Sequence, residues 1–116
     1  MLAALQTLAD LPCAGRRIAV LGDMAELGAH AAEAHREVGG RVVELGIPRL
    51  IAVGWWSNEI AEAAHNAGTV DVIEVPDATS AVVALQHFAE PGDLVLLKAS
   101  RVTGLERIAQ VMKART

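Results

Sequence analysis

Short apolar runs alternate with amphipathic stretches along this chain. Four runs are rich in aliphatic and β-branched residues, as is typical of strands buried inside a sheet. Between them, apolar residues recur at every third or fourth position, which predicts helices with one buried face. The predicted strands cover residues 17–21, 50–53, 70–75 and 93–98, and the predicted helices cover 2–11, 31–45, 59–67, 78–88 and 103–113.

This alternation predicts the fold class and the ends of several elements. Parallel strands joined through helices need crossover connections, which are almost always right-handed. We therefore expect one α/β domain over residues 1–116: a three-layer, doubly wound, Rossmann-like and mostly parallel sheet of about four strands, with helices on both faces. Pro12 should stop the first helix, Gly46 should close the second, and Ser57 is the expected N-cap of the third.

Ligands bind such sheets beyond the carboxyl ends of the strands, so the loops after the strands are candidate sites. The loop after the first strand places Asp23 and Glu26 in a turn between glycines. The two carboxylates could position a cation or an amine. Alternatively, Asp23 could cap a helical turn and Glu26 could complete a capping box. The residue pattern leaves both interpretations open.

The fourth strand ends in a cluster of cationic and hydroxyl side chains formed by Lys98, Ser100 and Arg101. An ammonium, a hydroxyl and a guanidinium at the ligand edge suit an anionic group such as a carboxylate. The alternative is that the two cations are solvated or pair with the acidic residues of the first loop. Because three polar residues follow an apolar strand at this edge, the pattern favours function.

Composition and motifs argue against several classes of ligand. The chain has 10 Lys and Arg against 14 Asp and Glu, a net charge of −4, and no cluster of basic and aromatic residues, so nucleic acid and anionic membrane are not expected partners. Between Leu21 and Gly28 the only glycine is Gly22, too few for a dinucleotide loop, and the phosphate-binding loop motif is absent. Cys13 is the only cysteine, which fits a reducing cytoplasm.

The histidines and tryptophans have different predicted roles. His30 and His35 are five residues apart, which does not place them on one helix face, so we predict no metal site. All four histidines are expected to have structural or surface roles. Trp55 and Trp56 are adjacent, and neighbouring side chains of an extended chain point to opposite sides. One tryptophan is therefore predicted to lie exposed near the site or against a partner domain.

Two separated motifs resemble a known family. Residues 17–28 read RIAVLGDMAELG and are followed by HREVG at 35–39; residues 92–101 read GDLVLLKASR and are followed by Glu106. In this order they resemble the C-terminal domain of the Mur ligases that join D-alanyl-D-alanine to UDP-N-acetylmuramoyl-tripeptide. The resemblance runs through essentially the whole chain. Ala99 stands where that family usually has glycine.

The resemblance implies a three-domain enzyme of peptidoglycan and cell-wall synthesis. An N-terminal domain would hold the uridine nucleotide, a central domain would hold ATP and Mg²⁺, and this cytoplasmic C-terminal domain would close over the ATPase. ATP would phosphorylate the tripeptide carboxylate, and the amine of D-alanyl-D-alanine would attack the acyl phosphate. With the other two domains absent, we expect this chain to contain no catalytic residue or metal, to hold no cofactor and to be inactive alone.

The resemblance also implies roles for single residues. Lys98, Ser100 and Arg101 match a Lys-Gly-Ser-Arg signature and would contact D-alanyl-D-alanine, with Lys98 or Arg101 pairing with its carboxylate. Asp23 and Glu26 match a Gly-Asp-Met-x-Glu-Leu-Gly signature and would form the opposite wall.

Two other functions are compatible with the residue pattern. A receiver-like signalling module would need a phosphorylatable aspartate at the end of a middle strand, and only Asp77 could serve. A stand-alone binding module could recognise an acidic metabolite through Lys98 and Arg101.

Overall fold

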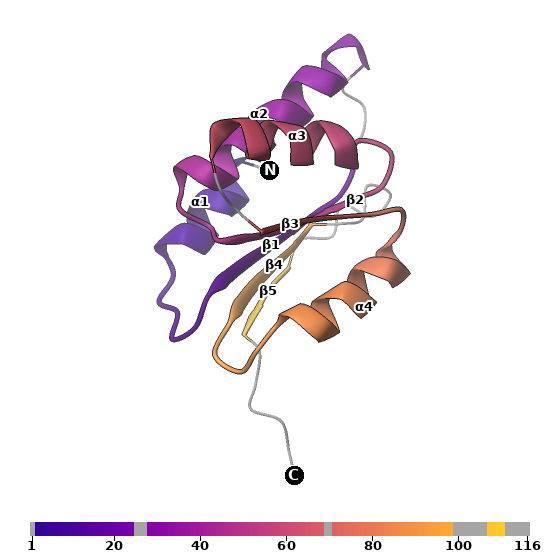
Figure 1. Ribbon diagram of the computed structural model, residues 1–116. Coiled ribbons are helices and arrows are strands. Elements are labelled where there is room, and N and C mark those ends of the chain that lie inside the picture. The colour runs from indigo at the N-terminus through magenta and orange to yellow at the C-terminus, as the bar shows by residue number, and fades with distance from the viewer. Residues whose placement is uncertain (1, 25–27, 69–70, 99–106, 111–116) are drawn as a thin grey trace.

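The computed structural model describes residues 2–24, 28–68, 71–98 and 107–110, which form one five-stranded sheet with helices on both faces (Figure 1). The helices are α1 (Leu2–Asp10), α2 (Ala31–Glu44), α3 (Ser57–Ala67) and α4 (Ala78–Phe88), with a short 3-10 turn, η1 (Gly28–His30), before α2. The strands are β1 (Arg17–Leu21), β2 (Arg49–Val53), β3 (Asp71–Val75), β4 (Leu94–Lys98) and β5 (Arg107–Gln110).

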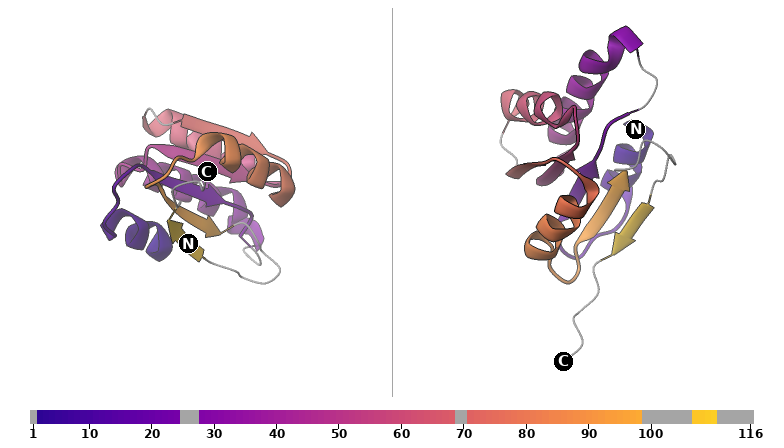
Figure 2. Two further views of the ribbon diagram at one scale, coloured as in Figure 1. Left: turned by 90° about the horizontal axis from the view of Figure 1, so that it is seen from below. Right: turned by 90° about the vertical axis from the view of Figure 1, so that its right-hand side faces the viewer.

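The strand order is β3-β2-β1-β4-β5, and the first four strands are parallel. In Figure 2 the helices flank the sheet on its two sides, so the predicted three-layer, mostly parallel fold is confirmed. None of the helices within the described ranges is long and apolar enough to cross a membrane.

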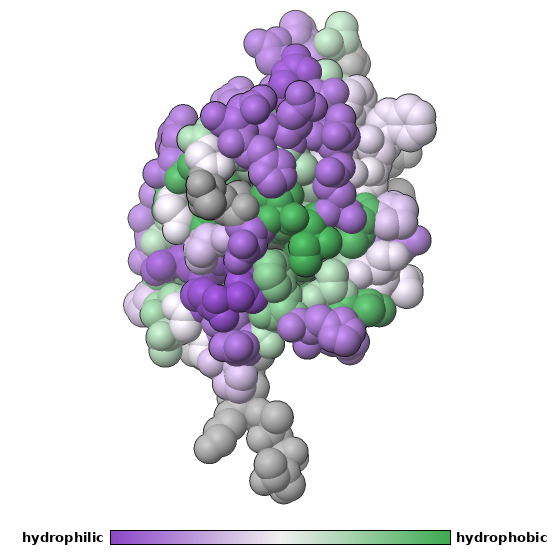
Figure 3. Space-filling model, viewed as in Figure 1, coloured by the Kyte–Doolittle hydropathy of each residue, from purple (hydrophilic) through white to green (hydrophobic). Residues whose placement is uncertain are grey.

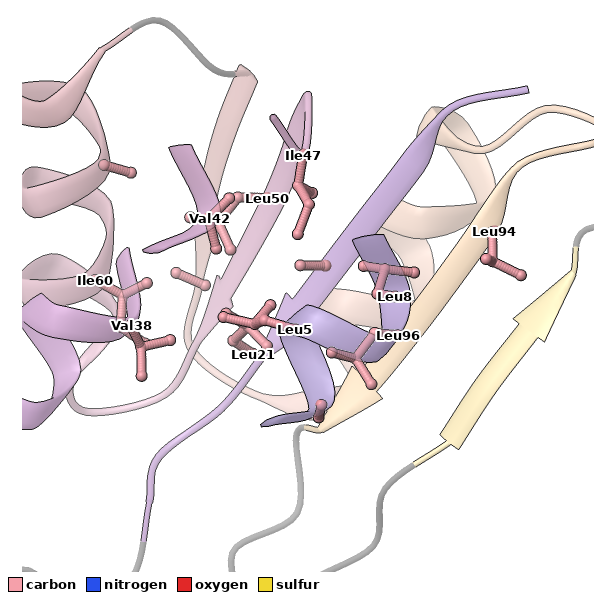
Figure 4. Close-up of a cluster of buried hydrophobic side chains, with 14 residues drawn as sticks. Leu5, Leu8, Leu21, Val38, Val42, Ile47, Leu50, Ile60, Leu94 and Leu96 are labelled. Carbon is pink, nitrogen blue, oxygen red and sulfur yellow. The ribbon is translucent and has the colours of Figure 1, made fainter. Parts of the chain in front are cut away.

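Alternate residues of β1, β2, β3 and β4 contribute to two separate hydrophobic cores. In β1, Ala19 and Leu21 pack with α1, α2 and α3, whereas Ile18 and Val20 pack with α4. Figure 4 shows the larger core, in which Leu5 of α1 lies near Leu21. Because a strand buried on both faces needs apolar residues at every position, this packing explains the continuous apolar runs in the sequence.

The crossing of α2 and α3 depends on a glycine. A Cβ atom added to Gly39 would collide with the backbone oxygen of Ile60 on α3 and lie 3.2 Å from the Cβ of Ala63. Gly46 ends the α2 turn with φ +71°, a conformation that favours glycine, and its N–H donates to Val43 O. The prediction that Gly46 closes this helix is confirmed.

Two polar side chains hold the amino-terminal edge of the sheet together. The buried carboxylate of Asp93 accepts hydrogen bonds from the N–H groups of Arg16 (2.8 Å) and Glu90 (2.9 Å). The Arg17 guanidinium donates to Leu8 O (2.9 Å) and Leu11 O (2.6 Å) at the end of α1. These bonds satisfy backbone groups that the ends of the elements would otherwise leave without partners.

The final predicted helix is wrong where the structure describes it. Residues 107–110 form β5, which pairs antiparallel with β4 and brings Ile108 opposite Leu96. The pairing gives the outer backbone groups of β4 hydrogen-bond partners that a helix could not supply. Residues 103–106 and 111–113 of that predicted helix lie outside the described residues.

Candidate functional site

The topology places the carboxyl ends of β1 and β4 side by side. Helices α2 and α3 cover one face of the sheet and α4 covers the other, so the winding direction changes between β1 and β4 (Figure 2). In doubly wound sheets the ligand crevice lies at such a switch point, beyond the carboxyl ends of the strands. Leu21 pairs with Lys98 in register, and the Gly22 N–H donates to Lys98 O at 2.8 Å.

Lys98 is the cation that the structure places at this crevice. It is a half-buried residue at the end of β4, the strand that pairs with β1 before the loop that carries Asp23. A cation at a switch point can attract an anionic ligand through its charge. Ser100, Arg101 and Glu26, the other predicted site residues, lie outside the described residues.

Asp23 links the loop after β1 to the loop after β2. Its carboxylate accepts the backbone N–H of Trp55 at 3.1 Å and that of Trp56 at 2.8 Å. Gly54 has φ +97°, and a Cβ atom there would lie 2.8 Å from Asp23 Oδ2. The carboxylate therefore sits where only glycine leaves room for it.

These contacts change two expectations about caps. Ser57 is not the N-cap of α3: the helix begins at Ser57, its N-cap is Trp56, and no side chain of that residue caps it. The carboxylate of Asp23, from a neighbouring loop, binds the N–H groups at this helix start instead. Asp23 thus accepts hydrogen bonds from backbone N–H groups, as a capping residue would, but these groups belong to another loop.

His35 has a structural role, as predicted. Its ring is buried, and its Nε2 accepts the Met24 N–H at 2.9 Å, so the proton must be on Nδ1, which donates to Ala31 O at 2.6 Å. The ring stacks on Trp56 with a centroid separation of 5.2 Å and an interplanar angle of 18°. His35 therefore ties the loop after β1 to the loop after β2 a second time.

Trp55 and Trp56 differ as their adjacency predicted. Trp56 is half-buried against His35, whereas 83% of Trp55 is exposed to solvent. The sequence signals that one of the pair is exposed, but only the Asp23 and His35 contacts decide which one.

Asp77 caps its own helix. Its side chain accepts the Ser80 N–H at 2.8 Å at the start of α4, and this hydrogen bond lowers the pKa of the Asp77 carboxyl below its ordinary value of 3.8. Asp77 follows β3, which is the outermost strand beside β2. A receiver-like site needs an aspartate at the end of a middle strand, so the arrangement argues against that alternative.

In the described part of the chain, two grooves lie on the side of the sheet that α1, α2 and α3 cover. One, of about 360 Å³, lies between the start of α1 and the amino-terminal half of α2; its lining residues are Leu2, Ala3, Met24, Ala34, Glu37 and Val38. The other, of about 610 Å³, lies between the outer sides of α2 and α3 and is lined by charged residues such as Glu59 and Glu62. In Figure 3, hydrophilic surface covers α2 and α3. The smaller groove adjoins the crevice loop through Met24.

Comparison with known proteins decides the family. The model of the family described as "Mur ligase, glutamate ligase domain" matches residues 1–101. This chain belongs to the Mur ligase family. The resemblance carried by the two sequence motifs is confirmed.

Several curated relatives of the Mur ligase domain carry the same name, UDP-N-acetylmuramoyl-tripeptide–D-alanyl-D-alanine ligase. The relative from Synechocystis is 40% identical and aligns with 98% of this chain and 25% of its own length. That from Mycobacterium tuberculosis H37Rv is 37% identical over 97% of this chain and 25% of its own length. The relative from Escherichia coli K12 is 33% identical and aligns with 97% of this chain and 24% of its own length. The chain therefore spans about a quarter of the length of these relatives.

The second motif of the Mur ligase domain runs the length of β4 and so reaches both edges of the sheet. Gly22, Asp23 and Met24 lie at the carboxyl edge, where they form the crevice loop. Gly92 and Asp93 lie at the amino edge, where Gly92 O accepts the Gly15 N–H at 2.9 Å and Asp93 binds backbone amides. The start of the second motif therefore has a structural role. Of the residues of this motif that the structure describes, Lys98 is the one that lies at the crevice.

The described residues of the Mur ligase domain do not form a metal site. Within these ranges, no group of three or more His, Cys, Asp or Glu side chains could hold a metal ion.

Proposed function

We propose that this chain is one domain of an ATP-dependent ligase that adds D-alanyl-D-alanine to UDP-N-acetylmuramoyl-tripeptide in cytoplasmic peptidoglycan synthesis. The observation that carries the proposal is the agreement among relatives: ligases of this name from two Mycobacterium species, Synechocystis, Escherichia coli and Bacillus subtilis all align with at least 86% of the chain. The chain spans about a quarter of those enzymes, so ATP, Mg²⁺ and the tripeptide would be held mainly by the remaining domains.

In this proposal the domain closes over the ATPase and presents the amino substrate. The dipeptide offers a carboxylate at one end and the attacking amine at the other. Lys98, with Arg101 and a hydrogen bond from Ser100, would hold the carboxylate, because cations bind carboxylates through charge-assisted hydrogen bonds. The loop around Asp23 and Glu26 would form the facing wall. The pairing of Leu21 with Lys98 at the carboxyl ends of β1 and β4 supports this arrangement.

The hydrogen bonds of Asp23 indicate a more specific role for this residue in the proposal. Both of its oxygens accept backbone N–H groups from the next loop. Asp23 would therefore act as a positioning residue that shapes the wall, while the cations of the opposite loop contact the substrate.

The test replaces the charge of Lys98 in the full-length ligase. We expect Lys98→Met to raise the KM for D-alanyl-D-alanine by about tenfold to a hundredfold, the usual size of a lost hydrogen bond to a charged group. The dipeptide amide, which lacks the carboxylate, should show no such increase between the two enzymes. ATP turnover dependent on the dipeptide is the measurement.

A matched control removes a cation from the opposite edge. Arg16 is a partly exposed cation near Glu90, at the amino ends of the strands, and Arg16→Met should leave the KM unchanged. An equal change in KM for the dipeptide and its amide would refute carboxylate binding by Lys98. Absence of dipeptide-dependent turnover in the unaltered full-length enzyme would refute the ligase function itself.

The isolated chain provides a second test. Because the site would be shared between domains, we expect no ATP turnover by the 116 residues alone and only millimolar or weaker binding of D-alanyl-D-alanine, about 4 kcal/mol or less. Micromolar binding in a calorimetric titration would instead favour a stand-alone binding module.

A further inference from the structure

The proposed function gives no role to two apolar features at the carboxyl edge of the sheet. They are the exposed indole of Trp55 and the groove lined by Leu2, Met24 and Val38. Building on the closure in the proposed function, we propose that Trp55 is the residue that anchors this edge against the ATPase domain of the same ligase.

The backbone that carries Trp55 is fixed before any docking. The Asp23 carboxylate binds the N–H groups of Trp55 and Trp56, and the Gly54 N–H donates to Val75 O at 2.9 Å. Within the described ranges, no hydrogen bond or ring stack holds the Trp55 indole itself, and 83% of the residue is exposed. A large ring on an immobile backbone loses little conformational entropy when it is buried by a partner.

The groove is connected to this loop through buried contacts. Met24 contributes to the groove wall, its N–H binds His35, and His35 stacks on Trp56 beside Trp55. Leu2, another wall residue, is 37% exposed at the start of α1. Figure 4 shows α1 with Leu5 near Leu21, the last residue of β1, so the start of α1 lies toward the carboxyl edge. The groove and the Trp55 indole therefore both lie at the carboxyl edge of the sheet.

Another domain of the ligase fits this edge better than the dipeptide does. The relatives are about four times as long as this chain, so most of such an enzyme lies outside it. A tryptophan can bury roughly 150–250 Å², which exceeds what the small methyl side chains of D-alanyl-D-alanine can cover. Tryptophan is also enriched at the centres of protein interfaces, where it contributes much of the binding energy.

A second copy of the chain fits the edge less well. A two-fold dimer buries the same surface on both copies. It would bring the carboxylates of Asp23 and Glu37 toward their own counterparts, in a chain whose net charge is −4. Like charges at an interface oppose association.

The test compares Trp55→Ala with Leu11→Ala in the full-length ligase. Leu11 is a matched control, because it is a partly exposed apolar residue that follows the far end of α1. If docking assembles the active site, Trp55→Ala should lower kcat by about tenfold, which corresponds to about 1.4 kcal/mol, with the KM for the dipeptide changed less than about twofold. Trp55→Phe should restore most of the activity, and Leu11→Ala should not differ from the unaltered enzyme.

A second readout does not depend on turnover. With the tripeptide substrate and a non-hydrolysable ATP analogue, small-angle X-ray scattering should report a smaller radius of gyration for the unaltered enzyme and no contraction for Trp55→Ala. Because Trp55 is exposed, the unfolding midpoint of the isolated chain should not change with this substitution.

Three results would overturn the docking proposal. One is a Trp55→Ala enzyme with the same kcat and the same contraction as the unaltered enzyme. Another is a raised KM for the dipeptide with unchanged kcat, which would make Trp55 a substrate contact. The third is dimerisation of the isolated chain that Trp55→Ala abolishes, measured by sedimentation. The enzyme could also contract in a way that depends on Trp55 and yet show no dipeptide-dependent turnover. That result would support the docking and refute only the proposed reaction.

Discussion

Two neighbouring glycines of α2 offer a sharp test of the helix packing. Gly39 faces α3, where an added Cβ atom would collide with the backbone oxygen of Ile60. Gly40 has no atom within 4 Å of such a Cβ atom. The substitutions Gly39→Ala and Gly40→Ala therefore add the same methyl group at consecutive helical positions, one against a backbone and one into open space.

The two substitutions should change the free energy of unfolding in opposite directions. Alanine in place of glycine inside a helix stabilises it by about 1 kcal/mol, which is the expected gain for Gly40→Ala. The same gain applies at Gly39, but overpacking costs about 1–3 kcal/mol. We expect the upper end of that range, because the obstructing Ile60 oxygen is part of the α3 backbone and cannot rotate away. Gly39→Ala should therefore be destabilised by about 2 kcal/mol, about 3 kcal/mol less stable than Gly40→Ala.

Thermal and urea unfolding of the isolated chain, followed by circular dichroism, measures this difference. For a domain of this size, 1 kcal/mol corresponds to roughly 4 °C in Tm, so Gly40→Ala should melt about 4 °C higher and Gly39→Ala about 8 °C lower than the unaltered chain. The urea m-value should not change, since neither methyl group alters the exposed area of the unfolded state. A Gly39→Ala variant at least as stable as the unaltered chain would refute the close α2–α3 contact.

Three aspartates give further predictions. Asp23→Ala removes the acceptor of two backbone N–H groups, and urea unfolding should report a loss of about 2 kcal/mol, with Asp23→Asn in between because one acceptor oxygen remains. Asp93→Ala leaves two N–H groups at a buried position without their acceptor, so the same assay should give about 3 kcal/mol; a loss under about 0.5 kcal/mol would contradict the described role. For Asp77, the Ser80 N–H lowers the pKa of the carboxyl, so its stabilisation is present above pH 3.8 and is lost as the pH falls through the lowered pKa. Unfolding curves of Asp77→Ala and the unaltered chain should thus differ at neutral pH and converge in acid, whereas a difference independent of pH would exclude the cap.

The sequence alone determined most of the secondary structure and the fold class. The runs that became β1, β2 and β4 are apolar at successive positions, and a strand buried on both faces has few alternatives to such a run. The run that became β3 includes Asp71 and Glu74, which are exposed at the edge of the sheet. The helices α1, α2, α3 and α4 followed from their periodicity, because one apolar stripe must be buried against the sheet. The exposure of one tryptophan was also predicted, although Trp55 and Trp56 lie in a turn and not in the extended chain that the prediction assumed.

Only the tertiary structure decided which loops meet and what Asp23 binds. Local pattern suggests that an aspartate before a helix caps its own turn, but parallel pairing of β1 and β2 brings the N–H groups of Trp55 and Trp56 to its carboxylate. The strand at residues 107–110 has the same origin, because its partner is the free edge of β4, and no local signal announces a pairing partner. Periodicity reports which faces are buried, whereas contacts between segments distant in sequence depend on strand order, which the chain fixes only when it folds.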